Sequence, residues 1–142
     1  MDIVITTKGR YKGIKGKFWD VFSDYIRLRD FLKYGTCITC GKKVSSYKEL
    51  QGGHYAPAGN CGFYLLFHED NVNGECGGCN AFDSGHLVWY GKNLKNRIGE
   101  ERYNHVISEY DASRFKGKTT KQWNKREFEA KILEYKNKIK EL

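Results

Sequence analysis

Two Cys-x-x-Cys pairs constrain this chain more than any other feature of its sequence. Cys37 and Cys40 form the first pair, and Cys76 and Cys79 form the second. A Cys-x-x-Cys turn directs two thiolates at one ion, with metal–sulfur bonds of about 2.3 Å, so two turns complete a tetrahedral zinc site. Four thiolates leave no open coordination position. We therefore expect a structural Zn²⁺ that folds this segment and takes no part in chemistry.

Two other uses of these thiols stay open at this stage, namely disulfide bonds and thiol redox chemistry. Disulfides suit an oxidising compartment, but residues 1–10 lack the apolar core of a signal peptide. No stretch approaches the roughly 20 apolar residues that a membrane span needs. We therefore expect a soluble, cytoplasmic protein without a membrane partner. The fifth cysteine, Cys61, is expected to be a small core residue.

The charge distribution predicts a polyanionic partner. The chain has 25 Lys and Arg against 17 Asp and Glu, a formal net charge of +8. The excess lies at the two ends, residues 1–17 and residues 115–142, so the centre is nearly neutral. Nucleic acid, held through its phosphates, is the favoured partner, although lysine-rich ends can also act as solubilising arms.

Hydrophobic periodicity divides the chain into four parts. Residues 1–16 are interpreted as a basic arm with a short strand at 3–6, and residues 17–35 as a helix that Gly35 ends. Residues 36–90 lack long periodic runs and are expected to form a compact Cys/His module. Residues 91–142 are expected to be a basic helical region.

Within these parts the residue pattern predicts individual elements. Short strands are expected near residues 50–55 and 63–67, followed by a short helix that begins within residues 71–75. Helices are also expected over residues 92–110, with a break at Gly99 and another over 111–117, and over residues 119–142, capped by Thr119 or Thr120.

A second set of candidate metal ligands lies in the same module. If Cys79 is on a helix, Asn80 and Asp83 lie one turn apart on one face. Their oxygens suit Mg²⁺ or Mn²⁺. His54, on a neighbouring strand, could face that metal and take a proton from water, because its ordinary pKa is near neutral. Such a metal would stabilise the charge that builds up on a scissile phosphate.

The order of these motifs resembles the zinc-stapled HNH nucleases (His-Me finger or ββα-metal nucleases), in particular endonuclease VII-like Holliday junction resolvases. The chain resembles the phage NinG/Rap recombination proteins more closely still. The residues that carry the resemblance are 22–30, 37–41, 52–55, 58–62, 67–72, 76–80, 84–85 and 97–99.

The resemblance implies an α+β fold, in which a small zinc-stapled ββα-metal module is flanked by α-helices. It implies that His54 is the general base, that Asn71 orients His54 or braces the loop beside it, and that Asn80 binds the catalytic metal. Most HNH nucleases place a metal ligand, Asp or His, directly before the base, whereas this chain has Gly53. The candidates for the missing ligand are Asp83 first, then Asp70 and His68.

The expected function is therefore a structure-selective DNA endonuclease that hydrolyses branched recombination intermediates, such as Holliday junctions and D-loops, with a divalent metal. We expect a phage-encoded protein in the bacterial host cell and a homodimer formed through the apolar stripes of the terminal helices. The alternative is a non-catalytic zinc module that binds DNA or a recombination partner, which Gly53 favours. The candidate DNA contacts are Arg27, Arg29, Lys92, Lys95 and Arg97.

Overall fold

The computed structural model of the chain describes residues 10–82 and 86–142. A two-stranded sheet and several helices make up the described part, which confirms the α+β class. The expected strand at residues 3–6 lies outside the described residues. The elements in chain order are α1 (Gly13–Lys33), the 3-10 turn η1 (Tyr47–Glu49), β1 (Leu50–His54), α2 (Gly62–Leu66), β2 (Val72–Cys76), α3 (Gly77–Phe82), α4 (His86–Ile98), α5 (Glu100–Phe115) and α6 (Lys125–Lys140).

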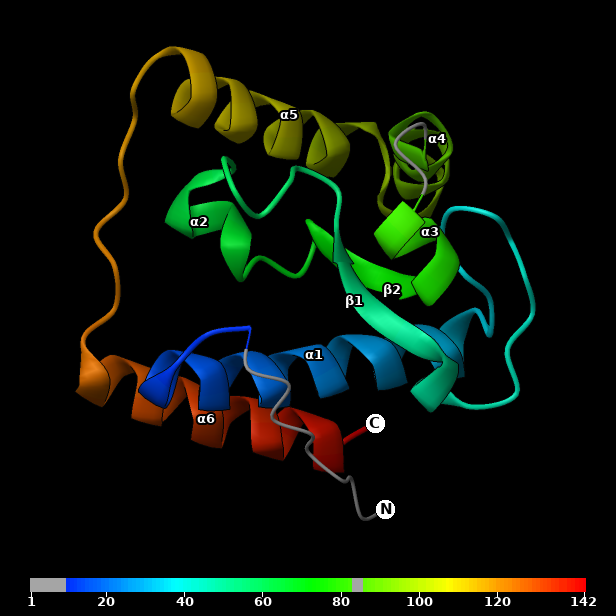
Figure 1. The fold of residues 1–142 in the computed structure, drawn as a ribbon, viewed down its shortest axis with the longest axis horizontal. Coiled ribbons are helices and arrows are strands. Elements are labelled where there is room, and N and C mark those ends of the chain that lie inside the picture. Colours follow the sequence, from blue (N-terminus) through cyan, green and yellow to red (C-terminus); the bar gives the residue numbers. More distant parts are fainter. Residues whose placement is uncertain (1–9, 83–85) are drawn as a thin grey trace.

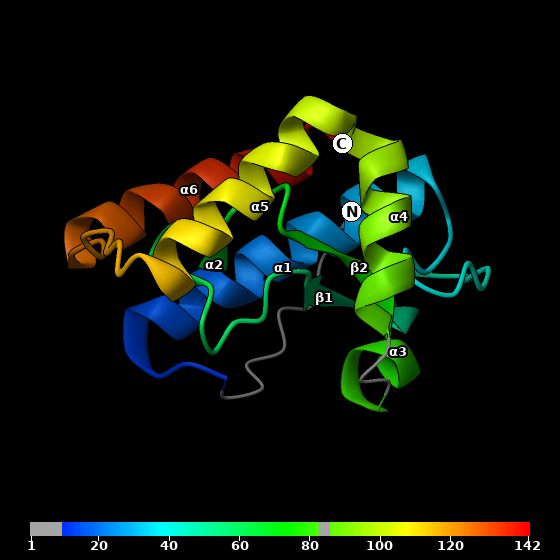
Figure 2. The same ribbon diagram turned by 90° about the horizontal axis from the view of Figure 1, so that it is seen from above.

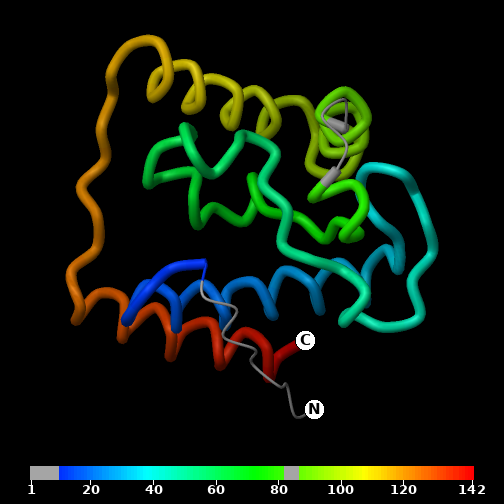
Figure 3. The backbone as a smooth tube through the Cα atoms, viewed as in Figure 1, coloured from blue at the N-terminus to red at the C-terminus, as the bar shows by residue number. Residues whose placement is uncertain are grey.

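The elements are stacked in layers around the β-hairpin (Figures 1 and 2). Helices α1 and α6 lie side by side and run in the same direction, whereas α5 lies on the opposite side of the hairpin. Helix α4 crosses the end of the molecule near α3. The tube in Figure 3 shows the long connection, residues 116–124, that brings the chain from the end of α5 back to the start of α6.

Aromatic side chains hold the α1–α6 layer together. Phe22 of α1 packs edge-on against Tyr135 of α6, with ring centroids 5.1 Å apart. Phe18 contacts Phe128 at 5.9 Å and Trp123, which precedes α6, at 5.3 Å. The apolar stripes of the terminal helices are therefore buried within one chain. These stripes therefore cannot form the dimer interface that the sequence suggested, and the homodimer itself stays a prediction.

Strands β1 and β2 form an antiparallel pair in which His54 lies opposite Val72 and Gln51 lies opposite Glu75. Successive residues of a strand face opposite sides. A Cβ on Gly52 would point at Trp19 and Ser23 of α1, whereas a Cβ on Gly53 would point at Glu75 and Asn80. The hairpin thus presents one face to α1 and the other to α3.

Two predictions in the middle of the chain are wrong. Residues 63–67 belong mainly to α2, not to a strand, and residues 72–76 form β2, not the start of a helix. A short apolar run fits a strand or a helix equally well, so burial decides, and here α2 buries Leu65 and Leu66. The side chain of Asn71, directly before β2, binds backbone groups of other segments.

Other element boundaries are confirmed or shifted. Gly35 (φ +67°) follows α1, and Gly99 (φ +87°) separates α4 from α5, as predicted. Helix α5 continues through the predicted break to Phe115. Helix α6 begins at Lys125 because Asn124 and Glu127 form a reciprocal capping box, so Thr119 and Thr120 lie in the preceding connection. No helix in the described ranges is both long and apolar enough to span a membrane.

Candidate active site and cysteine cluster

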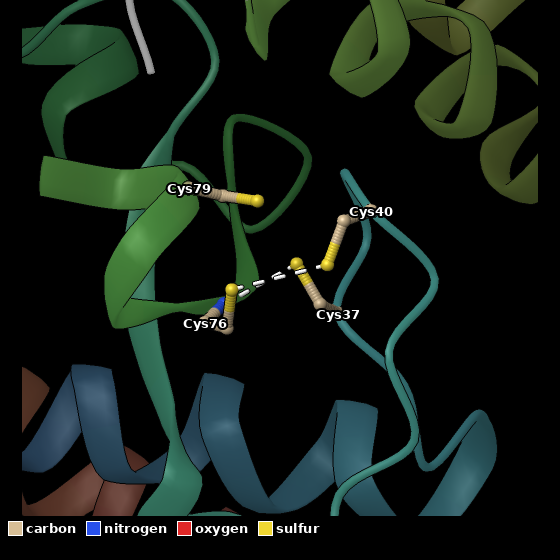
Figure 4. Close-up of side chains that lie close together, drawn as sticks. All are labelled: Cys37, Cys40, Cys76 and Cys79. Carbon is tan, nitrogen blue, oxygen red and sulfur yellow. Dashed lines mark hydrogen bonds between the residues drawn. The ribbon is translucent and has the colours of Figure 1, made fainter. Parts of the chain in front are cut away.

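The four cysteines of the two Cys-x-x-Cys pairs converge on one point (Figure 4). Their sulfur atoms all lie within 4.8 Å of one another, and Cys40 Sγ is 3.9 Å from Cys76 Sγ. Zinc–sulfur bonds of about 2.3 Å in a tetrahedron place sulfurs about 3.8 Å apart. The cluster therefore fits a closed four-thiolate zinc site, and a zinc ion there would join the loop before η1 to the β2–α3 junction.

Backbone groups around the cluster are arranged to support thiolates. The N–H groups of Thr39 and Cys76 point at Cys37 Sγ, at 3.4 and 3.3 Å. Gly41, at φ +74°, closes the first turn, and its N–H donates to the carbonyl of Cys37. Cys61 lies elsewhere, buried in the main apolar core, as predicted. Burial raises the pKa of its thiol to about 11.

His54, the predicted general base, is the last residue of β1 and is 8% exposed. Its ring stacks on Trp19 of α1, with centroids 5.2 Å apart and planes 15° from parallel. Its Nε2 lies 2.9 Å from the carbonyl oxygen of Leu66. Because a carbonyl oxygen only accepts, Nε2 must carry the hydrogen, and Nδ1 keeps its lone pair.

The protonation state of His54 follows from this environment. Burial lowers the pKa of His54 to about 4, and Arg10 lowers it further, although the hydrogen bond to Leu66 acts in the opposite direction. The imidazole is therefore neutral near pH 7. A neutral imidazole with a defined tautomer and a free Nδ1 lone pair can accept a proton.

Asn71 is completely buried and braces the loop beside His54. Its Oδ1 accepts from the N–H of Ala56 at 2.7 Å, and its Nδ2 donates to the carbonyl groups of Ala56 and Leu65. These contacts tie the segment after His54 to the end of α2, directly before the Leu66 carbonyl that holds His54. The structure places no hydrogen bond between Asn71 and the His54 ring within the described residues, so bracing is the geometry it supports.

Asn80, the predicted metal ligand, lies on α3 and faces β1. Its Nδ2 donates to Gln51 Oε1 at 2.8 Å. Its Oδ1 lies 3.2 Å from the position that a Cβ on Gly53 would occupy, and that Cβ would also collide with the carboxylate of Glu75. Amide and carboxylate oxygens therefore meet beside Gly53, and such oxygens fit Mg²⁺ or Mn²⁺.

A cleft of about 270 Å³ opens between α1 and β1, with Asn80 and Gly52 in its wall. Asp20 and Asp24, one turn apart on α1, line the same cleft. The Oδ2 atom of each is buried and accepts no hydrogen bond from the described residues. Burial, together with the charge of Asp20, raises the pKa of Asp24 to about 6, although Arg27 opposes this shift.

Cations border the same cleft. Arg10, Arg27 and Lys48 line it, and an adjoining hollow of about 370 Å³ is lined in part by Lys12 and Lys17. Arg27 also donates to the Leu50 carbonyl and to Asp24, which fixes its position. This basic border, in the same cleft as Asn80, is suited to a phosphate backbone.

The remaining predicted DNA contacts lie in different settings. Arg29 donates to Asp30, to Asn73 and to the carbonyls of Glu69 and Val72, so its guanidinium is engaged inside the fold. Arg97 stacks over Tyr34 at 3.7 Å and donates to Thr36. These two arginines hold elements together and are poorly placed to contact DNA.

Lys92 and Lys95 are exposed on α4 and stay candidate DNA contacts. The cleft, by contrast, adds Arg10 and Lys48, which the sequence had not singled out. The basic charge of residues 1–17 was the signal for Arg10. No sequence feature indicated Lys48, because only the turn η1 brings it to the cleft.

Two of the three candidates for the missing metal ligand, Asp70 and His68, do not join this site, and the third, Asp83, lies outside the described residues. Asp70 forms a two-point ion pair with Arg102 of α5. His68 accepts the N–H of Asp70 and packs against Tyr64. Both belong to the turn before β2, where their side chains fasten α5 and α2.

Comparison with known proteins gives a consistent result. Residues 8–142 match a family model described as the bacteriophage lambda NinG protein. The chain is 33% identical over 118 residues to protein ninG of Escherichia phage lambda, covering 83% of this chain and 52% of the relative. It is 32% identical to protein ninG of Salmonella phage P22 over the same shares.

The chain spans about half the length of these curated relatives. A protein ninG of Escherichia phage 933W is similar to the same extent, with 33% identity over 118 residues. No solved structure matches the chain.

Proposed function

We propose that this chain, which belongs to the NinG family of bacteriophage proteins, is a metal-dependent DNA endonuclease of the HNH, or His-Me finger, type. The family membership supports a phage protein of the recombination region. Strands β1 and β2, with α2 in the connection between them, and the following helix α3 supply the elements expected of a ββα-metal module, and the cysteine cluster lies at the β2–α3 junction. The nuclease activity is the step that goes beyond family membership.

One observation carries the proposal, namely the setting of His54. The Leu66 carbonyl holds its Nε2, Trp19 covers its ring, and burial keeps it neutral. Trp19, which covers the His54 ring, also lines the cleft that holds the acidic, amide and basic side chains. In the proposed reaction Nδ1 takes the proton from the water that attacks the phosphodiester.

Side chains of the cleft and of the loop after His54 supply the remaining functions. Arg10, Arg27 and Lys48 bind the phosphates that flank the scissile bond, and Asn71 keeps the loop next to His54 in place. Asn80 would hold Mg²⁺ or Mn²⁺ through Oδ1. Such an ion, when bound, stabilises the negative charge of the transition state and of the leaving oxygen. The cysteine cluster would hold Zn²⁺ with a structural role only.

Branched recombination intermediates, such as Holliday junctions and D-loops, are the proposed substrates. Cleavage of two strands of a junction would call for a homodimer, which we retain as part of the proposal. The bacterial host cell of the phage is the proposed site of action. Products would carry 5′-phosphate and 3′-hydroxyl ends.

Cleavage of an end-labelled four-way junction, with matched linear duplex as the comparison substrate, tests the proposal. Zinc-loaded protein should cut the junction in Mg²⁺ or Mn²⁺ and not in EDTA. His54→Ala should lose at least about 100-fold in rate, the usual contribution of general-base catalysis, and should bind the junction as tightly as the wild type.

The control variant is His105→Ala, because His105 lies on α5 and contacts Tyr64 and not the cleft. This variant should retain the wild-type cleavage rate. Binding without cleavage by the wild type under every metal condition would instead identify the chain as a non-catalytic zinc module for DNA or a recombination partner, the rival that Gly53 favours.

A further inference from the structure

We infer that Glu75, from strand β2, supplies the metal ligand that Gly53 lacks, so that Glu75 Oε1 and Asn80 Oδ1 form the oxygen pair of the divalent-cation site. This inference rests on the proposed function, because it assigns the ligands of the cation which that function requires. It assigns this role to a residue on the partner strand in place of Asp70 and His68, whose side chains are engaged elsewhere.

The first argument is the space beside Gly53. A Cβ at this position would collide with the Glu75 side chain, while Asn80 Oδ1 would lie 3.2 Å away. Gly53 is not among the glycines with positive φ, so its backbone conformation does not itself require glycine. What excludes a side chain is the Glu75 carboxylate, which occupies the space where an aspartate at residue 53 would begin.

The second argument is the pairing of the strands. Glu75 lies opposite Gln51, and Gly53 is two residues from Gln51, on the same face of the hairpin. A glutamate on β2 is long enough to reach diagonally across to the neighbouring strand position. The carboxylate therefore reaches the space beside Gly53 from the opposite strand, on the face of the hairpin that α3 covers.

The third argument is how the neighbouring groups aim the two ligand atoms. Thr39 Oγ1 donates to Glu75 Oε2 at 2.5 Å, so the other oxygen, Oε1, is the one that faces Gly53. Gln51 accepts from Asn80 Nδ2, so Asn80 presents Oδ1 to the same place. A carboxylate and an amide oxygen that converge in this way suit a hard divalent cation, which completes its shell with water and phosphate oxygens.

The arrangement also links the two proposed metal sites. Thr39 lies between Cys37 and Cys40, and Glu75 directly precedes Cys76. Zinc binding would hold both partners of the Thr39–Glu75 hydrogen bond in place, so the structural ion would preorganise the ligand of the catalytic ion. Outer-shell contacts of this kind commonly change metal affinity by about 10- to 100-fold.

The test measures Mn²⁺ binding to zinc-loaded protein without DNA, by isothermal titration and by the loss of the free Mn²⁺ EPR signal. Zinc content is measured in the same samples by atomic absorption. The wild type should bind one Mn²⁺ in addition to its zinc. Glu75→Gln, which keeps the shape and the acceptor for Thr39, should weaken Mn²⁺ binding at least about 10-fold with zinc retained.

Moving the carboxylate from residue 75 to residue 53 distinguishes loss of a metal ligand from loss of the folded structure. Glu75→Ala should lose Mn²⁺ binding, and the double variant Gly53→Asp/Glu75→Ala should recover it, because the space vacated by Glu75 accommodates the new carboxylate. Glu129→Gln, an exposed change on α6, is the matched control and should bind Mn²⁺ like the wild type.

Each outcome decides the inference. It is overturned if the wild type binds no Mn²⁺ beyond its zinc, if Glu75→Gln binds Mn²⁺ with wild-type affinity, or if the swap fails to restore binding in a folded, zinc-loaded protein. Glu75-dependent Mn²⁺ binding without junction cleavage would keep this inference and refute the nuclease. Cleavage that persists in Glu75→Gln would keep the nuclease and refute this inference.

Discussion

At the scale of single residues, burial determines what the ionisable groups can do. His54 is covered by Trp19 and held by the Leu66 carbonyl, so its pKa falls to about 4 and it stays neutral over the physiological range. Asp24 is also buried, but for a carboxyl the same desolvation raises the pKa, here to about 6. Burial thus shifts both groups toward their uncharged forms, the unprotonated imidazole and the protonated carboxyl.

The lowered pKa of His54 predicts the pH dependence of the proposed cleavage. A general base must be unprotonated, so the rate should not fall at the ordinary histidine pKa of 6.5 as the pH is lowered. The decline should be centred near pH 4. The measurement is the initial cleavage rate from pH 3.5 to 8, with circular dichroism to confirm folding at each pH. A midpoint at or above 6.5 would contradict the burial of His54.

The raised pKa of Asp24 predicts a pH-dependent gain in stability for Asp24→Asn. Because the pKa of Asp24 is about 6 in the folded state and 3.8 in the unfolded state, ionisation of Asp24 destabilises the folded protein. The free energy of unfolding is therefore unaffected below about pH 4 and falls by about 3 kcal/mol as the pH rises through 6. Asp24→Asn should therefore be more stable than the wild type at pH 8, by about 2 kcal/mol, and should show no gain at pH 4.

Urea unfolding at the two pH values provides the measurement for Asp24→Asn. The control is Asp111→Asn, an exposed change on α5 that should move the free energy of unfolding by no more than about 0.5 kcal/mol. A loss of stability at pH 8 in Asp24→Asn would show that the ion pair with Arg27, 2.9 Å long, outweighs the desolvation of Asp24.

At the scale of elements, the β1–β2 hairpin and α3 carry the proposed general base and the proposed metal ligands, namely His54 on β1, Glu75 on β2 and Asn80 on α3. Their positions depend on the cysteine cluster, because Cys76 ends β2 and Cys79 lies within α3. The cluster could be predicted from spacing alone, since each Cys-x-x-Cys turn is a local structure. Strand β2 and helix α2 could not, because short segments of five residues take the conformation that their neighbours allow.

Removal of the cluster should release the β2–α3 junction from the rest of the molecule. Cys76→Ser should lose the single zinc of the wild type and show a lower Tm, because structural zinc supplies folding free energy directly. Zinc released on thiol modification, measured with a metal-sensitive dye, gives the stoichiometry. Cys61→Ala, which changes a cysteine outside the cluster, should keep one zinc per chain. Equal zinc content in both variants would refute the four-cysteine site.

At the scale of the whole molecule, α1 connects the two halves of the structure. One side of α1 packs on the aromatic residues of α6, and another side carries Trp19, Asp20 and Asp24 into the cleft beside β1. The C-terminal helix is therefore a support for the helix that forms one wall of the candidate active site. The helical stripe of α6 was predictable from periodicity, but its partner was not, since an amphipathic stripe does not specify what covers it.

This packing predicts that α6 contributes strongly to stability. Phe128→Ala, at a position 4% exposed, should lower the free energy of unfolding by about 3 kcal/mol or more, because it removes a ring from the core and leaves a cavity. Leu133→Ala on the same helix, at a position 62% exposed, should cost less than about 1 kcal/mol. Urea unfolding measures both. Similar losses in the two variants would contradict the α1–α6 interface.

The amino-acid sequence by itself determined the features that depend on local chain geometry. These are the two cysteine turns, the helices on either side of the module, and His54 and Asn80 as candidate site residues. Only the tertiary structure decided which residues from distant segments meet, because that depends on strand register and helix packing. It buried the stripes of α1 and α6 against each other, directed Asp70 to Arg102, and brought Glu75 to the space beside Gly53. The sequence shows that residue 53 has no side chain, whereas the register of β2 shows that the Glu75 carboxylate occupies the space beside it.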